Sequence, residues 1–158
     1  MNAYDQTDLR LAAEAGIRAP SLDNSQPWLF RLAGGGIEIS SDPDRRLPHC
    51  DRTGWAARIA GGAAVLNARL ALAAAGRPAQ VRLHPDLHRP GLLARLTPGR
   101  LRPPTYAERD LWVAIPRRYS NRQPFWPDPV PTAIRMRLIA AARDEGARLD
   151  LLVGMTAL

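Results

Sequence analysis

The sequence predicts an α+β fold in which a mixed sheet packs on one long, buried central helix. Two short alternating segments, residues 28–32 and 37–41, flank a run of three glycines at 34–36, which is the pattern of a β-hairpin. The longest helical signal covers residues 54–75 and is apolar nearly all round, so we expect it to be buried on several sides. Asn67 lies in its middle and will need a hydrogen-bond partner if it is buried.

The first helix is expected over residues 8–18, where apolar side chains recur on one face. Thr7 or Asp8 is the expected N-cap, because both carry an oxygen that can accept from the first free backbone N–H groups. Pro20 ends the helix, since proline disfavours helical backbone in the residue before it.

The later elements complete the order α-β-β-α-β-β-α-α-β, which is typical of an α+β or mixed α/β domain. Alternation and turn residues predict strands at residues 80–84 and 148–153, and helices at 106–115 and 132–146. Thr105 is the expected cap of the third helix. Residues 92–96 fit a strand or a short helix equally well.

The composition is that of a globular, cytoplasmic protein. The chain has 158 residues, of which 46% are hydrophobic and 23% charged, enough for a sizeable core. No apolar run reaches the ~18 residues of a membrane span, and the polar first residues do not resemble a secretory signal. The lone cysteine, Cys50, excludes an internal disulfide, and its neighbours His49 and Asp51 have no second ligand cluster, so no metal is expected.

The net charge is +7, which raises the hypothesis of a basic nucleic-acid or interaction module. All 22 basic residues are arginines, however, and they are spread along the chain among aspartates and glutamates. This distribution argues against a concentrated nucleic-acid surface. The positive field would still favour anionic ligands such as phosphates.

Two polar segments are the candidates for a ligand site. Residues 19–28 read APSLDNSQPW, in which two prolines fix the backbone and four polar side chains can bond the backbone or a ligand. Residues 117–122 read RRYSNR. On the residues alone, the favoured interpretation of the first segment is a polar loop closed by a core tryptophan, and that of the second is a solvated basic turn before a helix.

Three segments together resemble the FMN-dependent nitroreductase superfamily. APSLDNSQPW at residues 19–28 is similar to the family's APSxxNxQPW, and residues 61–76 resemble its long central helix, with small residues at the start and a closing glycine. RYSNR at 118–122, followed by PF and by PVP at 129–131, is similar to the family's R-x-S-x-R…F…P-V-P segment. The resemblance covers most of the chain and implies a nitroreductase-like fold.

The order of the motifs resembles one branch of that superfamily. In an ordinary nitroreductase the arginine motif precedes APSxxNxQPW, whereas here it follows. The order is similar to that of the Acg-type tandem branch, in which two nitroreductase-like halves are fused. On this resemblance, residues 1–115 are a first half and residues 116–158 the start of an incomplete second half.

The resemblance also implies a cofactor site. Arg118 would reach the FMN phosphate or the N1/O2 edge of the flavin, Ser120 would hydrogen-bond near that edge, and Arg122 would hold the phosphate. The residues that would close over the ring from the other half are Pro20, Ser21, Asn24 and Gln26. No catalytic residue of the protein is expected, because the protein mainly orients cofactor and substrate.

The activity implied by the resemblance is hydride transfer from NAD(P)H to FMN, followed by two-electron transfer to a nitroaromatic or quinone-like acceptor. The alternatives are a protein that binds or stores flavin without turnover, and a non-functional fragment of a tandem nitroreductase. A homodimer through the helix from Gly54 to Ala75 would supply the second half of a composite site.

Overall fold

The structure is a computed structural model that describes residues 3–126 and 128–151, and it divides into two compact units. The first unit ends at Ser120 and contains the sheet with helices α1, α2 and α3. The second begins at Asn121 and contains helix α4.

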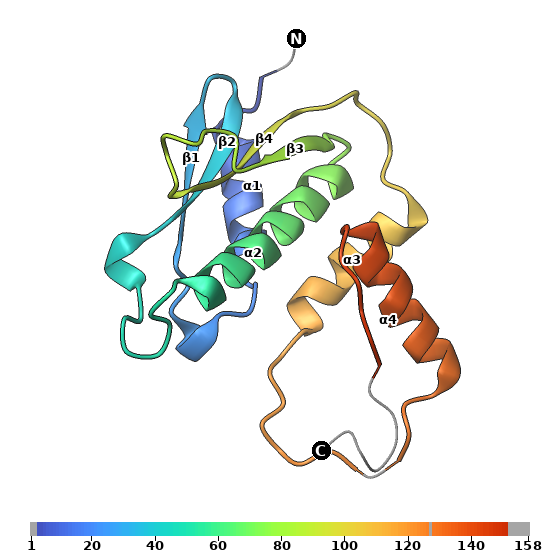
Figure 1. The fold of residues 1–158 in the computed structure, drawn as a ribbon. Helices are drawn as coiled ribbons and strands as arrows, with labels where there is room; N and C mark the ends of the chain where they lie inside the picture. Colours follow the sequence, from blue (N-terminus) through green and yellow to red (C-terminus); the bar gives the residue numbers. More distant parts are fainter. Residues whose placement is uncertain (1–2, 127, 152–158) are drawn as a thin grey trace. The chain divides into compact units, whose positions relative to one another are not determined.

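The sheet of the first unit has four strands in the order β1-β2-β4-β3 (Figure 1). Their bounds are Trp28–Ala33 (β1), Gly36–Ser41 (β2), Ala79–Leu83 (β3) and Leu92–Pro98 (β4). The predicted hairpin is confirmed, with Trp28 paired to Ser41 and Ala33 to Gly36. Residues 92–96, which fitted a strand or a short helix equally well, belong to strand β4.

The prediction of a mixed sheet is wrong, because every strand pair in the described residues is antiparallel. Strands β1 and β2 are joined by a tight turn, and β3 and β4 by a short loop, and such direct connections force antiparallel pairing. Helix α2 is the one long connection, and it carries the chain to the far edge of the sheet, where β3 pairs only with β4.

Helices α1 (Gln6–Gly16) and α2 (Trp55–Ala74) pack on one face of the sheet. The two helices contact each other as well as the strands (Figure 1). Residues that are at most 5% exposed and form this core include Ala12, Ile37, Ile39, Ala64, Ala68, Leu72, Ala94 and Leu96. The small side chains of α1 and α2 let the helices approach closely, and the larger aliphatic side chains come mainly from the strands.

Helix α2 is covered along part of its surface. Residues Ala60 to Ala73 include the buried positions, whereas Trp55 and Ile59 are 65% and 54% exposed. The helix begins after Gly54, whose φ of 69° lies in the left-handed region. The Asp51 carboxylate accepts hydrogen bonds from the backbone N–H groups of the first helical turn, which lowers the pKa of that carboxyl.

Asn67 finds the partner that its position requires. Its Nδ2 donates to the carbonyl oxygen of Ala15 at the end of α1, at 3.1 Å. We expect Asn67→Leu to lower the free energy of unfolding by about 1 kcal/mol, the usual net value of one such hydrogen bond, because the Ala15 carbonyl keeps only its bond from the Arg18 N–H. Chemical denaturation followed by far-UV circular dichroism measures the change, and an unchanged midpoint would contradict it.

The N-cap of α1 is Asp5, so the predicted caps Thr7 and Asp8 were wrong. The Asp5 Oδ1 accepts from the N–H groups of Thr7 and Asp8 at 2.8 and 3.0 Å, and the Asp8 carboxylate accepts from the Asp5 N–H at 2.9 Å. The helix therefore starts earlier than its apolar face indicates. Asp8 also lies 3.1 Å from Arg77, which offsets the cost of burying its charge.

Helix α3 (Tyr106–Ala114) begins where it was predicted, with Thr105 as its cap. The Thr105 Oγ1 accepts from the Glu108 N–H, and the Glu108 carboxylate accepts from the Thr105 N–H, which is a capping box. Bonds from Arg102, reinforced by Thr105, lower the pKa of Glu108 to about 2.

The second unit contains helix α4 (Thr132–Asp144), close to the predicted range. The predicted strand at 148–153 is wrong for residues 148–151, which form no strand, and residues 152–153 lie outside the described part. Alternating apolar and polar residues form a strand only where a second strand is available to hydrogen-bond with. The described part of this unit contains no such strand. No helix among the described residues combines the length and apolar character needed to cross a membrane.

Candidate functional site

The segment from Ala19 to Trp28 is anchored at both ends and exposed between them. Ala19 and Trp28 are 3% and 5% exposed. Between them the chain makes a short 3₁₀ turn at Leu22–Asn24. The Ser21 Oγ accepts from the Gln26 N–H at 3.0 Å, which closes the loop on itself. The loop therefore has a defined shape although most of its side chains face outward.

The backbone of this loop is strained. Asp23, Asn24 and Gln26 have φ values of 50°, 55° and 49°, in the left-handed region that non-glycine residues rarely adopt. Aspartate and asparagine tolerate this region best, whereas glutamine gains no such relief. Strained positions of this kind cluster at ligand sites, where the surrounding structure holds them.

Arg118 joins the two sequence motifs. Its Nε and Nη2 donate to the carbonyl oxygen of Arg18 at 3.3 and 3.1 Å, across one hundred positions of the sequence. Arg18 directly precedes Ala19 and Pro20, so the guanidinium is fixed at the start of the strained loop. The contact also places helix α3 and the turn that follows it, Ile115–Arg117, beside the end of α1.

The seven predicted site residues are divided between the two units. Pro20, Ser21, Asn24, Gln26, Arg118 and Ser120 belong to the first unit, and Arg122 belongs to the second. Pro20, Asn24, Ser120 and Arg122 are exposed, and Ser21 and Gln26 are half-buried. Of the arginine motif, Arg118 is the residue that the structure brings to the APSLDNSQPW loop.

A cavity of about 450 Å³ lies between α1 and the α3 region, and we call it the α1–α3 cavity. Its lining is mostly apolar and includes Leu11, Ala15, Trp112, Val113, Ile115 and Pro116, with Glu14, Arg18 and Arg117 as its charged residues. Arg18 thus lines the cavity with its side chain and holds Arg118 with its carbonyl. The sequence analysis missed this cavity, and the signal for it was the pair of apolar residues, Trp112 and Val113, in a short polar helix.

The donor set of the first unit fits FMN in its chemistry. The Asn24 and Gln26 amides and the Ser21 hydroxyl can donate to, and accept from, the edge of a flavin ring. Arg118 keeps its Nη1 for an anion while Nε and Nη2 are bonded to a carbonyl, and Arg18 adds a second positive charge nearby. The two ligand classes that FMN presents, a polar ring edge and a phosphate, therefore each find suitable groups here.

A charged cluster that the sequence analysis missed lies on the sheet. The Glu38 side chain is fully buried, and Arg31, Arg89 and Arg95 all donate to its carboxylate. The bonds from Arg89, Arg31 and Arg95 outweigh burial and lower the pKa of Glu38 to about 2. The hairpin register could have predicted the pair of Glu38 with Arg31, because the two residues face each other across β1 and β2.

The described residues contain no group of three or more histidine, cysteine, aspartate or glutamate side chains placed to hold a metal ion.

Comparison with known proteins gives the class of this chain. No family model matches it. Curated proteins that carry the name "Putative NAD(P)H nitroreductase" match most of its length at 31–33% identity, which supports the nitroreductase superfamily as its class.

Two of these relatives, both from Mycobacterium tuberculosis strain H37Rv, carry the name "Putative NAD(P)H nitroreductase". Rv3131 is 33% identical over 135 residues, 82% of this chain and 38% of its own length. Acg is 31% identical over 144 residues, 91% of this chain and 44% of its own length. Rv3127, an uncharacterized protein of the same strain, is 31% identical over 121 residues. The chain thus spans less than half the length of the curated relatives it matches.

Proposed function

We propose that this chain is part of an FMN-dependent NAD(P)H oxidoreductase of the nitroreductase type. The observation that carries the proposal is the Arg118 guanidinium held on the Arg18 carbonyl, at the start of the strained loop. It holds the first residue of RYSNR next to the start of APSLDNSQPW, and these are two of the three segments that carry the family resemblance. Two relatives carry the name "Putative NAD(P)H nitroreductase", which supports the same class of activity.

In this proposal FMN, when bound, takes a hydride from NAD(P)H and passes two electrons to a nitroaromatic or quinone-like acceptor. Arg118 provides a fixed positive charge for the phosphate or for the flavin edge that becomes negative on reduction. Ser120 would bond near that edge. Arg122 would hold the phosphate.

The loop would supply the polar contacts to the ring. Pro20 sets its entry, and the Ser21 hydroxyl, already fixed by the Gln26 N–H, keeps one proton to donate. The Gln26 Nε2 donates to the Asn24 Oδ1 at 3.4 Å, so the two amides are held together before a ligand arrives. A preformed loop of this kind orients the ring and costs little further ordering on binding.

The composite site would need a second half. We propose residues 1–115 as a first nitroreductase-like half and residues 116–158 as the start of a second. The exposed side of α2, with Trp55 and Ile59, would be covered in the assembled protein, which would make α2 a buried central helix. A second copy of the chain, paired through α2, is the partner we propose for a homodimer in the cytoplasm.

The Arg118→Gln variant tests the proposed cofactor site. FMN added to the whole chain is followed by flavin fluorescence and by isothermal titration calorimetry. We expect the variant to bind FMN about 30-fold more weakly, since it loses one charge-assisted interaction worth about 2 kcal/mol. Arg109→Gln on the exposed side of α3 is the matched control and should bind FMN as the wild type does.

Equal FMN affinity of both variants and the wild type would contradict the role of Arg118. Absence of any FMN binding would remove the proposed function. Turnover is then measured as NAD(P)H oxidation with a nitroaromatic acceptor. Bound FMN that NAD(P)H does not reduce would favour the alternative, a flavin-binding or flavin-storing protein without turnover.

A further inference from the structure

One row of charged residues crosses all four strands on the face of the sheet away from the core. Ile37, Leu96 and Val81 are paired across β2, β4 and β3 and face the core. Side chains alternate along a strand, so the next paired residues face the other side. That row consists of Arg31, Glu38, Arg95 and Arg82, each paired with the next across the strands.

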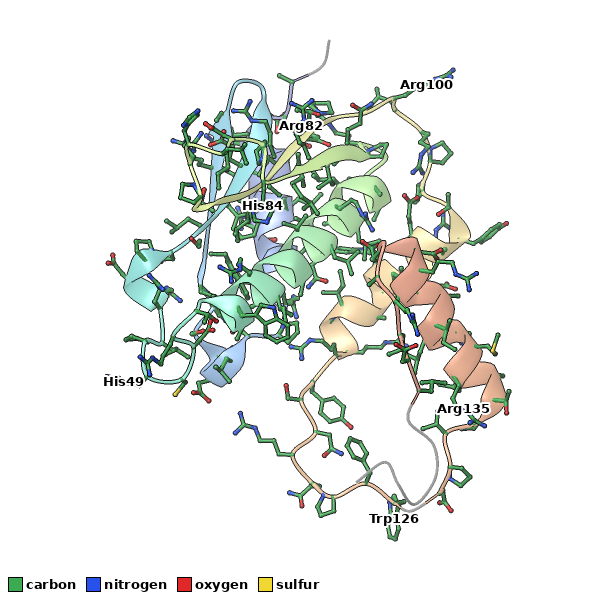
Figure 2. The ribbon with its side chains drawn as sticks, in the orientation of Figure 1. His49, Arg82, His84, Arg100, Trp126 and Arg135 are labelled. Carbon is green, nitrogen blue, oxygen red and sulfur yellow. The ribbon has the colours of Figure 1, made fainter. Side chains whose placement is uncertain are left out.

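Positive charge is in excess on this face. Arg89, from the loop between β3 and β4, adds a fourth guanidinium by bonding to Glu38. The acidic groups near the row are Glu38, which is shared by three arginines, and Asp86, in the same loop as Arg89. The hydrogen bond to Glu38, and to a smaller extent the charge of Asp86, raise the pKa of Arg89. The Arg82 side chain has no hydrogen bond or ion pair within the described residues, and Figure 2 marks it on the sheet.

A cavity of about 390 Å³ lies at the Arg82 end of the row. Its lining residues are Gln80, Val81, Arg82, Pro85, Arg95 and Thr97. The Nε of Arg95 is buried without a hydrogen-bond partner, although the rest of that guanidinium bonds Glu38. The side chains of Gln80, Arg82 and Thr97 likewise have no partner among the described residues. Four groups that can donate therefore surround one hollow.

We infer that this cavity binds a phosphate-type oxyanion carried by a small molecule. Arginine presents planar, permanently charged donors that match the oxygens of phosphate, and an amide and a hydroxyl complete the set. A buried donor without a partner calls for a bound group that satisfies it. None of the lining residues belongs to the proposed flavin site.

The shape and charge of the face favour a small anion over a nucleic-acid backbone. A backbone is tracked by a long basic stripe. Here the lining of the hollow holds two arginines, Arg82 and Arg95, and the row is interrupted by the buried carboxylate of Glu38.

Inorganic pyrophosphate is the probe for this site, titrated into the whole chain by calorimetry at low and at physiological salt. We expect binding that Arg82→Gln weakens at least about tenfold, because the variant removes one charged partner of the anion. Arg82 is exposed and unpartnered, so this change leaves the fold intact. Thr97→Val should weaken binding by a smaller factor, about threefold, since it removes one neutral donor.

Arg109→Gln is the matched control for net charge and should bind pyrophosphate as the wild type does. Three results would overturn the inference: no heat of binding at about 1 mM pyrophosphate, equal affinity of Arg82→Gln and wild type, or equal loss in Arg82→Gln and Arg109→Gln. Tighter binding of single-stranded DNA that Arg82→Gln abolishes would instead identify a nucleic-acid surface. FMN titration of Arg82→Gln should be unchanged, which separates this test from that of the proposed function.

Discussion

Replacing Glu38 with glutamine is expected to lower the free energy of unfolding by about 3 kcal/mol. The carboxylate is fully buried and accepts hydrogen bonds from Arg31, Arg89 and Arg95. Glutamine keeps the size of the side chain, but it leaves three guanidinium groups around a neutral amide, where their mutual repulsion is no longer offset. Urea denaturation followed by far-UV circular dichroism measures the loss.

Glu14→Gln is the control for this prediction. Glu14 pairs with Arg10 at 2.7 Å on the surface of α1, and both side chains are more than half exposed. An exposed pair of this kind contributes about 0.5 kcal/mol or less. Comparable losses in Glu38→Gln and Glu14→Gln would show that the cluster on the sheet contributes no more than a surface ion pair.

Glu38 also makes the stability of the protein depend on pH. The pKa of Glu38 is lowered from 4.5 to about 2 in the folded chain, so its contribution to stability is complete above the unfolded value and is lost as the pH falls toward 2. We expect this pH-dependent contribution of Glu38 to the free energy of unfolding to be about 2 kcal/mol. It is smaller than the pKa shift alone would give, because the arginines are partly exposed and screened. The difference in stability between wild type and Glu38→Gln should therefore shrink between pH 4.5 and pH 2. A constant difference would contradict the linkage.

Replacing Gly36 with alanine is expected to cost about 3 kcal/mol as well. Gly36 is buried at the start of β2, and an added Cβ would lie 2.5 Å from the carbonyl oxygen of Leu96 on the neighbouring strand. The obstacle is backbone rather than a flexible side chain, so relief requires β2 and β4 to separate and weakens their hydrogen bonds. Thermal and urea denaturation measure the change.

Gly62→Ala is the matched control for this substitution. Gly62 lies on the exposed side of α2, and no other atom would lie within 4 Å of its added Cβ. Alanine is the better helix former by about 1 kcal/mol, so this variant should be as stable as the wild type or more stable. A loss in Gly62→Ala as large as that in Gly36→Ala would contradict the contact with Leu96 as the cause.

The elements that the sequence predicted well are those fixed by local rules. The hairpin at β1 and β2 follows from alternation around a glycine turn, and the start of α3 follows from the capping box of Thr105 and Glu108. The cap of α1 was missed because Asp5 lies a turn before the first apolar residue, Leu9, on which the prediction relied. Sheet direction was missed because it depends on which strands become neighbours, which single-strand patterns do not contain.

The site was predictable to the extent that its motifs are local. The polar residues of the APSLDNSQPW loop could be named from the sequence, but the left-handed backbone at Gln26 could not, since glutamine has no preference for it. The α1–α3 cavity depends on the packing of α1 against the α3 region, which is tertiary. Glu38 read as the polar position of an alternating strand, and its burial results from Arg89 in a distant loop.

The bond between Arg118 and position 18 has a consequence for sequence drift within the superfamily. The acceptor is a main-chain carbonyl, which every amino acid provides, whereas the donor is a guanidinium, which only arginine provides. For this bond alone, position 18 is therefore free to vary as long as the end of α1 is kept, and position 118 is not. Aligned relatives with the same contact should keep arginine at one end and show mixed residues at the other, so pairwise covariation would not detect this link.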